Sequence, residues 1–209
     1  MSGINPYIFR AYDVRGKVGT DITPDVFAQV GRAYGTLVCR RGGKTVALGM
    51  DNRVSSGPLK EAFAEGVLST GVDVVDIGVN HTPLLYFAAA HWKLDGGATV
   101  TGSHNPVSDN GVKMVHAGAA PLTEDEIQGL LASVTTGDFE RGRGTRTARS
   151  PRQEENGLGA RDLDALGVGR RIEDTGSAVP LDVGHENLLE RRRVLGEYDD
   201  AAWVRSFLR

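Results

Sequence analysis

The sequence predicts an α/β fold, a three-layer sandwich in which helices flank a mixed, largely parallel sheet. Over about the first 137 residues, short apolar runs typical of strands alternate with longer segments whose apolar residues recur at helical spacing. Several of the helical segments begin with a capping residue or a proline. Because strands that are separated by helices usually lie parallel, this order favours one sheet covered by helices on both faces.

Four helices are expected, and each has a recognisable start or end. They begin near residues 23, 58, 82 and 123. The first and third open on a capping threonine followed by proline, at Thr23 and Thr82. The fourth opens on a capping box, in which Glu126 follows Thr123 at the required spacing. Gly31 and Gly35 lie inside the first helix and indicate close packing of that helix against the sheet.

Four apolar runs are expected to be strands. They cover residues 45–50, 72–77, 97–101 and 112–116. The last run follows Asn110-Gly111, a dipeptide that favours a tight turn. In sheets of this kind ligands bind beyond the carboxyl ends of the strands, so the residues that follow position 101 are a candidate site.

Composition narrows the class of protein. The chain has 209 residues, of which 40% are apolar and 24% charged, as in a globular protein with a substantial core. A net charge of −3 favours neither nucleic acid nor a membrane surface as partner. Cys39 is the only cysteine, which excludes a disulfide framework. Without a long apolar span or a signal pattern, we expect a cytoplasmic protein.

The chain changes character after residue 137. Between residues 142 and 159 apolar periodicity is almost absent, and Arg, Gly, Thr, Ser, Gln and Glu dominate. A helical pattern of apolar residues resumes from residue 186. We therefore expect a folded domain over 1–137, a linker or disordered segment over 138–185, and a partly irregular C-terminal tail that becomes helical over 186–209.

Ser103 is the most suggestive candidate for chemistry. It lies in Thr-Gly-Ser-His-Asn-Pro, residues 101–106, just after a predicted strand, with Lys113 ten residues further on. Pro106 stops regular structure, so the hydroxyl is expected on a turn at the edge of the sheet, placed to receive or donate a group. An ordinary strand-to-loop turn is the alternative. Neighbours on an extended chain point to opposite faces, so His104 is not expected to act as the base for this serine.

Two further segments complete a family resemblance. Residues 9–16 read Phe-Arg-Ala-Tyr-Asp-Val-Arg-Gly, and residues 110–113 read Asn-Gly-Val-Lys. Together with the Ser103 segment they resemble the α-D-phosphohexomutases, in particular the phosphomannomutase/phosphoglucomutase branch. The resemblance covers about residues 4–137, which corresponds to the first of four domains in that family.

The resemblance implies a phosphoserine enzyme. It would interconvert the 1-phosphate and 6-phosphate of a hexose, glucose or mannose, through phosphorylated Ser103 and a hexose 1,6-bisphosphate. Catalytic roles would fall to Ser103, His104, Lys113 and Arg15, and substrate would be bound by Tyr12, Arg15, His104, Asn105 and Lys113. Alternatives remain at single positions, since Arg15 could simply pair with Asp13 and Tyr12 could serve packing.

A neighbouring loop also resembles the family. Asp51-Asn52-Arg53, after the first predicted strand, matches an Asp-x-Arg loop. We interpret Asp51 and Arg53 as a pair that supports the serine segment, with an ordinary surface ion pair as the alternative.

The family implies Mg²⁺, bound by the Ser103 phosphate and three aspartates. The aspartate loop Asp-Gly-Asp-Gly-Asp-Arg is absent from the sequence, as are the sugar loop Gly-Glu-x-Ser-Gly-His and the phosphate loop Arg-x-Ser-Gly-Thr. We therefore expect an incomplete metal site and little turnover by this chain alone. Either the chain is truncated, for example by a frame change, or residues 142–189 are an insertion. The alternative function is a non-catalytic relic that binds phosphosugars or dimerises.

Overall fold

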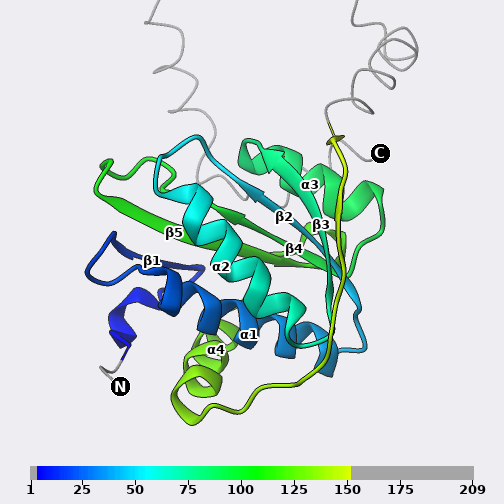
Figure 1. Ribbon diagram of the computed structural model, residues 1–209, viewed down its shortest axis with the longest axis horizontal. Helices are drawn as coiled ribbons and strands as arrows, with labels where there is room; N and C mark the ends of the chain where they lie inside the picture. The colour runs from blue at the N-terminus through cyan, green and yellow to red at the C-terminus, as the bar shows by residue number, and fades with distance from the viewer. Residues whose placement is uncertain (1–3, 152–209) are drawn as a thin grey trace, which may run out of the picture. The chain divides into compact units, whose positions relative to one another are not determined.

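The computed structural model describes residues 4–151, which form an α/β domain (Figure 1). The strands are β1 (Asp13–Lys17), β2 (Thr45–Met50), β3 (Asp73–Val79), β4 (Gly96–Val100), β5 (Asp109–His116) and β6 (Arg146–Ala148). The helices are α1 (Pro24–Arg40), α2 (Ser56–Leu68), α3 (Thr82–His91) and α4 (Glu124–Thr136), with 3-10 turns at Pro6–Ile8 and Ala117–Ala119.

The strands form one mixed sheet in the order β1-β5-β4-β2-β3-β6. β4, β2, β3 and β6 run parallel, whereas β5 is antiparallel to both β1 and β4. The predicted largely parallel sheet is therefore confirmed. The sequence analysis did not anticipate β1 or β6, the two edge strands.

Helices cover both faces of this sheet (Figure 1). Val46 and Leu48 of β2 point into the main core, which α1, α2 and α4 share, whereas Ala47 between them belongs to a second cluster with Leu85 and Ala88 of α3. This alternation is what a strand buried on both faces requires. The predicted three-layer arrangement follows, with α4 packed beside α1.

Most helix starts agree with the prediction. The Thr23 side chain accepts a hydrogen bond from the amide of Val26 at 3.3 Å, and the capping box of Thr123 and Glu126 is formed. Two boundaries differ. α2 begins at Ser56, two residues early, and Thr82 is the first residue of α3 rather than its cap, so that position falls to His81.

The glycines of α1 pack against α2 and not against the sheet, which corrects the prediction. A β-carbon on Gly31 would overlap the carbonyl of Phe63, and one on Gly35 would overlap the side chain of Thr70. Gly66 of α2 makes the reciprocal approach to Ala28. Backbones this close require glycine because no side chain fits between them.

Asn110 and Gly111 do not form a turn; both lie inside β5. The buried Asn110 side chain donates to the hydroxyls of Ser55 and Ser56 at 2.8 and 3.0 Å. A β-carbon on Gly111 would overlap the Val14 carbonyl of β1. These long-range contacts, which the sequence does not display, extend the strand through a dipeptide that otherwise favours turns.

The start of the segment predicted to be a linker is ordered against the domain. Asp138 and Glu140 accept hydrogen bonds from Arg40 at 2.8 and 3.1 Å. The amide of Gly142 donates to the carbonyl of Ser69, the cap of α2, at 2.9 Å, and the amide of Gly144 donates to Leu68 in the last turn of α2 at 2.8 Å. β6 then pairs with β3.

The linker prediction is therefore wrong over residues 138–148, because backbone pairing and ion pairs substitute for the missing apolar pattern. Residues 152–185 and the predicted helical tail 186–209 lie outside the described residues. Within residues 4–151, no helix combines the length and the apolar character needed to cross a membrane.

Candidate functional site

The candidate site lies where β2 and β4 end. Residues 51–53 (the aspartate–arginine loop) follow β2, and residues 101–108 (the serine loop) follow β4. Because β2 and β4 are parallel neighbours, both loops emerge from the same edge of the sheet. The amide of Asp51 donates to the carbonyl of Val100 at 2.9 Å, which joins the two loops at their base.

Ser103 is exposed at the tip of this arrangement and has an unusual backbone. Its φ of 50° is in the left-handed region, which non-glycine residues seldom adopt. The amide of Ser103 donates to the Thr101 hydroxyl at 2.8 Å, and Ser103 Oγ lies 3.1 Å from His104 Nδ1. The expectation that His104 faces away from the serine is therefore wrong, because the left-handed turn rotates both side chains to the same side.

Arg15 reaches the serine loop from β1. Its side chain is only 5% exposed, and Nη1 donates to the carbonyl of Gly102 at 2.6 Å. Nε and Nη2 donate to Asp13 at 3.1 and 2.6 Å, so the anticipated Asp13 pair and the loop contact occur together. Asn105 also donates to the Gly102 carbonyl, from its amide and its side chain, at 3.0 Å each.

Lys113 and Tyr12 lie near the site in the fold. Lys113 lies opposite Asp13 of β1 and Thr99 of β4, so it shares with Arg15 the face of the sheet that α3 covers elsewhere. Tyr12 immediately precedes β1 and is 71% exposed. The substrate and catalytic roles of these residues remain predictions.

Arg53 joins the two loops, as the sequence analysis proposed for this pair. Nε donates to Asp51 at 3.2 Å. The other donors reach main-chain carbonyls of the serine loop and of the residue after it: Nη1 to Pro106 and Asp109 at 2.7 and 3.1 Å, Nη2 to Asn105 and Ser103 at 2.7 and 3.1 Å. The pair is thus more than a surface ion pair.

The Asp51 carboxylate completes the connection. It accepts hydrogen bonds from the Gly102 amide at 3.0 Å, the Ser56 hydroxyl at 2.5 Å and the Arg53 amide at 3.0 Å. Partial burial raises the pKa of Asp51, but these hydrogen bonds outweigh burial and bring the pKa below its usual value. Asp51 is consequently an ionised acceptor at neutral pH. Ser56 was not identified from sequence, because a serine inside a helix carries no signal for this contact.

Mg²⁺ does not find a complete site among residues 4–151. No group of three or more His, Cys, Asp or Glu side chains in this part of the chain could hold a metal ion. A phosphate on Ser103 would supply oxygen ligands, but a divalent ion with oxygen ligands prefers six or more.

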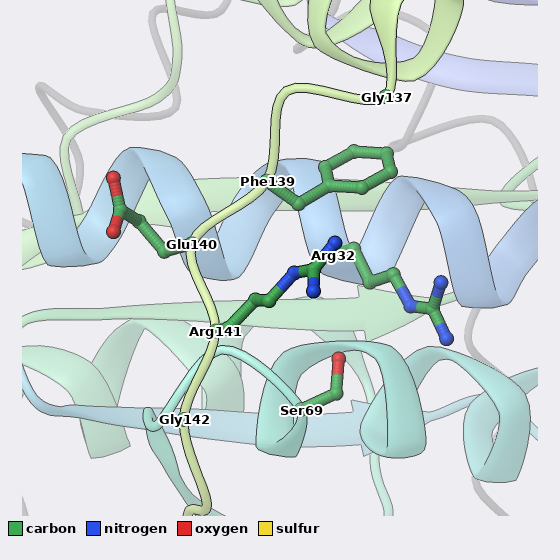
Figure 2. Close-up of a pocket in the computed structure, with 7 residues that line it drawn as sticks. All are labelled: Arg32, Ser69, Gly137, Phe139, Glu140, Arg141 and Gly142. Carbon is green, nitrogen blue, oxygen red and sulfur yellow. The ribbon is translucent and has the colours of Figure 1, made fainter.

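The domain also has a pocket of about 350 Å³ (Figure 2). It is lined by Arg32, Ser69, Gly137, Phe139, Glu140, Arg141 and Gly142. Ser69 follows α2 and precedes β3, so the pocket opens near the edge of the sheet opposite to Ser103. Its wall is the segment after α4, which is held to α1 by the Glu140 amide bonded to the Thr36 hydroxyl at 3.0 Å.

Comparisons with known proteins agree on one family. The model for phosphoglucomutase/phosphomannomutase alpha/beta/alpha domain I matches residues 6–141. A phosphomannomutase of Escherichia coli K12 is 47% identical over 117 residues, which are 56% of this chain and 25% of that protein. A phosphomannomutase of Klebsiella pneumoniae is 44% identical over 117 residues, 56% of this chain and 73% of that protein.

Comparison with solved structures points to the same family. A crystal structure of a phosphoglucomutase/phosphomannomutase family protein from Burkholderia thailandensis superposes with a TM-score of 0.70 at 40% sequence identity. The match covers 73% of this chain and 35% of that structure. Measured against the Escherichia coli relative, the similar region spans about a quarter of the relative's length.

Proposed function

We propose, on the premise that the chain belongs to the phosphoglucomutase/phosphomannomutase family, that Ser103 carries the phosphoryl group of a hexose phosphate mutase reaction. The substrates are the 1-phosphate and 6-phosphate of glucose or mannose, and the phosphoryl donor is a hexose 1,6-bisphosphate. One observation carries the proposal: the Ser103 hydroxyl is exposed at the sheet edge, on a loop whose backbone is held by two arginines. Phosphoryl transfer depends mainly on such positioning and on charge neutralisation.

Each transfer moves one phosphoryl group and one proton. Ser103 Oγ forms a bond to phosphorus as the bond from phosphorus to one sugar oxygen breaks, which yields phosphoserine and a hexose monophosphate. The hydroxyl proton of Ser103 passes to His104 Nδ1, 3.1 Å away, in the tautomer that keeps its own proton on Nε2. The departing sugar oxygen takes a proton from Lys113. In the reverse step phosphoserine transfers its phosphoryl group to the free 1- or 6-hydroxyl of a hexose monophosphate, which regenerates a bisphosphate; the hydroxyl proton passes to Lys113, and His104 returns its proton to Ser103 Oγ.

Charge around the transferring group comes from the same residues. Arg15 and Lys113 share a sheet face beside the loop and neutralise the phosphoryl oxygens. Asn105 orients the loop through the Gly102 carbonyl, and the exposed ring of Tyr12 contacts the sugar. We assign no step to Mg²⁺ in this chain, because residues 4–151 do not supply its remaining ligands.

The test is phosphorylation of Ser103 in the full chain. Incubation with glucose 1,6-bisphosphate should produce a species about 80 Da heavier, the mass of one phosphoryl group, by intact-mass spectrometry. Ser103→Ala should abolish this species. Ser108→Ala, which alters another exposed serine of the same loop, should retain it.

Two outcomes would oppose the proposal. Absence of the heavier species in the wild-type chain, together with binding of glucose 1-phosphate by calorimetry, would support the non-catalytic relic. Persistence of the species in Ser103→Ala would place the phosphoryl group on a different residue.

A further inference from the structure

We infer that Arg53 is the positioning residue of the serine loop: its guanidinium binds the carbonyl oxygens around Ser103 and so turns them away from the place where a phosphoryl group is received. The inference deepens the proposed function and rests on it for its catalytic consequence. Its structural part depends only on the contacts of residues 51–53 with residues 101–109.

The donor capacity of Arg53 is fully used. A guanidinium group has five N–H donors in a fixed plane. One donor of Arg53 binds the Asp51 carboxylate, and the remaining four bind main-chain carbonyls. Because each donor already has an acceptor, Arg53 does not contribute a ligand to a substrate phosphate while the loop has this conformation. Its effect on the reaction is therefore indirect.

The direction of the carbonyls has an electrostatic consequence. A carbonyl oxygen carries partial negative charge and repels the oxygens of a phosphoryl group, which carry about two negative charges on phosphoserine near neutral pH. Arg15 binds the carbonyl of Gly102, and Arg53 binds those of Ser103, Asn105 and Pro106. Four loop carbonyls are thus directed at cations and not at the Ser103 hydroxyl.

The same contacts support the left-handed backbone of Ser103. A non-glycine residue in this region is strained relative to its ordinary conformation. Arg53 bonds the carbonyls on both sides of the turn, at Ser103 and Asn105, so the turn cannot relax without breaking charge-assisted hydrogen bonds. This turn is what brings Ser103 Oγ and His104 Nδ1 to 3.1 Å.

The absence of a side chain at Gly102 makes room for the Arg53 guanidinium. A β-carbon at this position would overlap the guanidinium carbon and Nε of Arg53, so the group lies flat against the glycine backbone. A lysine could not take over the contact, because its ammonium has three donors around one point and no planar surface. The requirement is therefore for an arginine in particular and not for any positive charge.

The experiment compares Arg53→Ala and Arg53→Lys with the wild-type full chain. The matched control is Arg32→Ala, which alters an exposed arginine of α1 in the pocket of Figure 2. Two quantities are measured: the rate of phosphoserine formation from glucose 1,6-bisphosphate, and hydrogen exchange of the amides of Gly102, Ser103 and Asn105. Each is repeated with about 50 mM guanidinium chloride against equal sodium chloride, since salt itself screens charge.

We expect both Arg53 variants to form phosphoserine at least about tenfold more slowly, since several charge-assisted hydrogen bonds to the loop are lost. The loop amides should exchange faster by a similar factor. Guanidinium should restore both the rate of phosphoserine formation and the slow amide exchange in Arg53→Ala, because it can fill the cavity left by the arginine, but it should not do so in Arg53→Lys. Arg32→Ala should match wild type in both quantities. A wild-type rate of phosphoserine formation in Arg53→Lys would show that positive charge alone suffices, which would overturn the inference. Unchanged amide exchange in Arg53→Ala would also overturn it.

The two proposals fail in different ways. If the wild-type chain forms no phosphoserine, the proposed function fails, and amide exchange alone then decides whether Arg53 orders the loop. If the wild-type chain forms phosphoserine and both Arg53 variants keep its rate, the proposed function stands and the positioning role is wrong.

Discussion

At the scale of single residues, ionised side chains hold backbone segments together. Arg15 and Arg53 bind carbonyls of the serine loop, while Asp51 binds its amide at Gly102. Glu126 plays a comparable part at the start of α4, where one oxygen accepts from the Thr123 amide at 2.8 Å and from His116 at 2.9 Å. In each case the charge is matched to main-chain groups at a strand or helix end.

Glu126 makes stability depend on pH. Partial burial raises its pKa, but hydrogen bonds from His116, the Thr123 amide and Arg41 outweigh burial and lower the pKa from 4.5 to about 2. The carboxylate therefore binds protons less readily in the folded chain than in the unfolded chain. Its stabilisation is fully present above about pH 4.5 and is lost as the pH falls toward 2.

Glu126→Gln tests this dependence. Glutamine keeps the capping-box acceptor but removes the charge, so the free energy of unfolding at neutral pH should fall by about 1 kcal/mol. The difference from wild type should narrow as urea unfolding is repeated at lower pH, to about pH 3. Glu124→Gln, on the exposed side of the same helix turn, should have a smaller effect. A difference that stays constant with pH would show that the Glu126 charge is not responsible.

At the scale of elements, glycine controls the approach of α1 to α2. Gly31, Gly35 and Gly66 each face backbone or side-chain atoms of the opposite helix or the turn that follows it, with no room for a β-carbon. Gly129 of α4 is a contrasting case, because a β-carbon there would meet no atom within 4 Å. The two kinds of glycine should respond to alanine in opposite directions.

Gly66→Ala is expected to destabilise the domain by about 1–3 kcal/mol, since the added methyl overlaps the Ala28 carbonyl and lies 2.9 Å from the Arg32 amide. Gly129→Ala should stabilise it by about 0.5–1 kcal/mol, because alanine loses less backbone entropy in a helix. Urea unfolding of both variants measures the change in the free energy of unfolding, which should be opposite in sign for the two. Equal effects would mean that α1 and α2 can separate at little cost.

Helices with local caps and strands with apolar runs could be predicted from the sequence, whereas the edge strands β1 and β6, which depend on long-range contacts, could not. The caps at Thr23 and Thr123 and the apolar runs of β2 to β4 could be predicted because each is written in a few adjacent residues. β1 could not, since Asp13, Arg15 and Lys17 make it look exposed, and Arg15 is buried only because Gly102 and Asp13 satisfy it. β6 is likewise held by ion pairs of Arg146 with distant acids.

The site was predictable in identity but not in geometry. The motif around Ser103 and the pairing of Asp51 with Arg53 could be proposed from residue types and order. The carbonyls that Arg53 binds could not, because main-chain acceptors have no sequence signature. The contact of His104 with Ser103 was mispredicted for the same reason, since a left-handed serine looks like any other in the sequence.

At the scale of the whole molecule, the chain divides into two units, of which the first contains all of the described residues 4–151. The first unit closes its sheet with the segment that crosses α1 and α2 and ends in β6. Its last contacts include Arg149, whose guanidinium lies 4.0 Å from the centre of the Trp92 ring. The first unit therefore contains its own core and its own edge strand.

A chain that ends at residue 152 should fold as the full chain does. Its thermal midpoint should differ by less than about 4 °C, which corresponds to about 1 kcal/mol for a domain of this size. A chain that ends at residue 141 lacks β6 and should unfold at a distinctly lower temperature. Calorimetry of both provides the comparison. A broad, non-cooperative transition for the longer of the two would show that residues 153–209 contribute to this fold.

The parallel pairing of β6 with β3 determines where the backbone leaves the domain. After α4 the polypeptide crosses α1 and α2 to the amino-terminal end of β3, and pairing in the same direction with Val74–Asp76 points it toward the rim where β2 and β4 finish. Antiparallel pairing with β3 would instead have pointed the chain toward the opposite end of the strands. The carboxyl end of β6 therefore points toward the rim from which the serine loop emerges, so a fluorophore on the edge strand could report on phosphorylation at that rim.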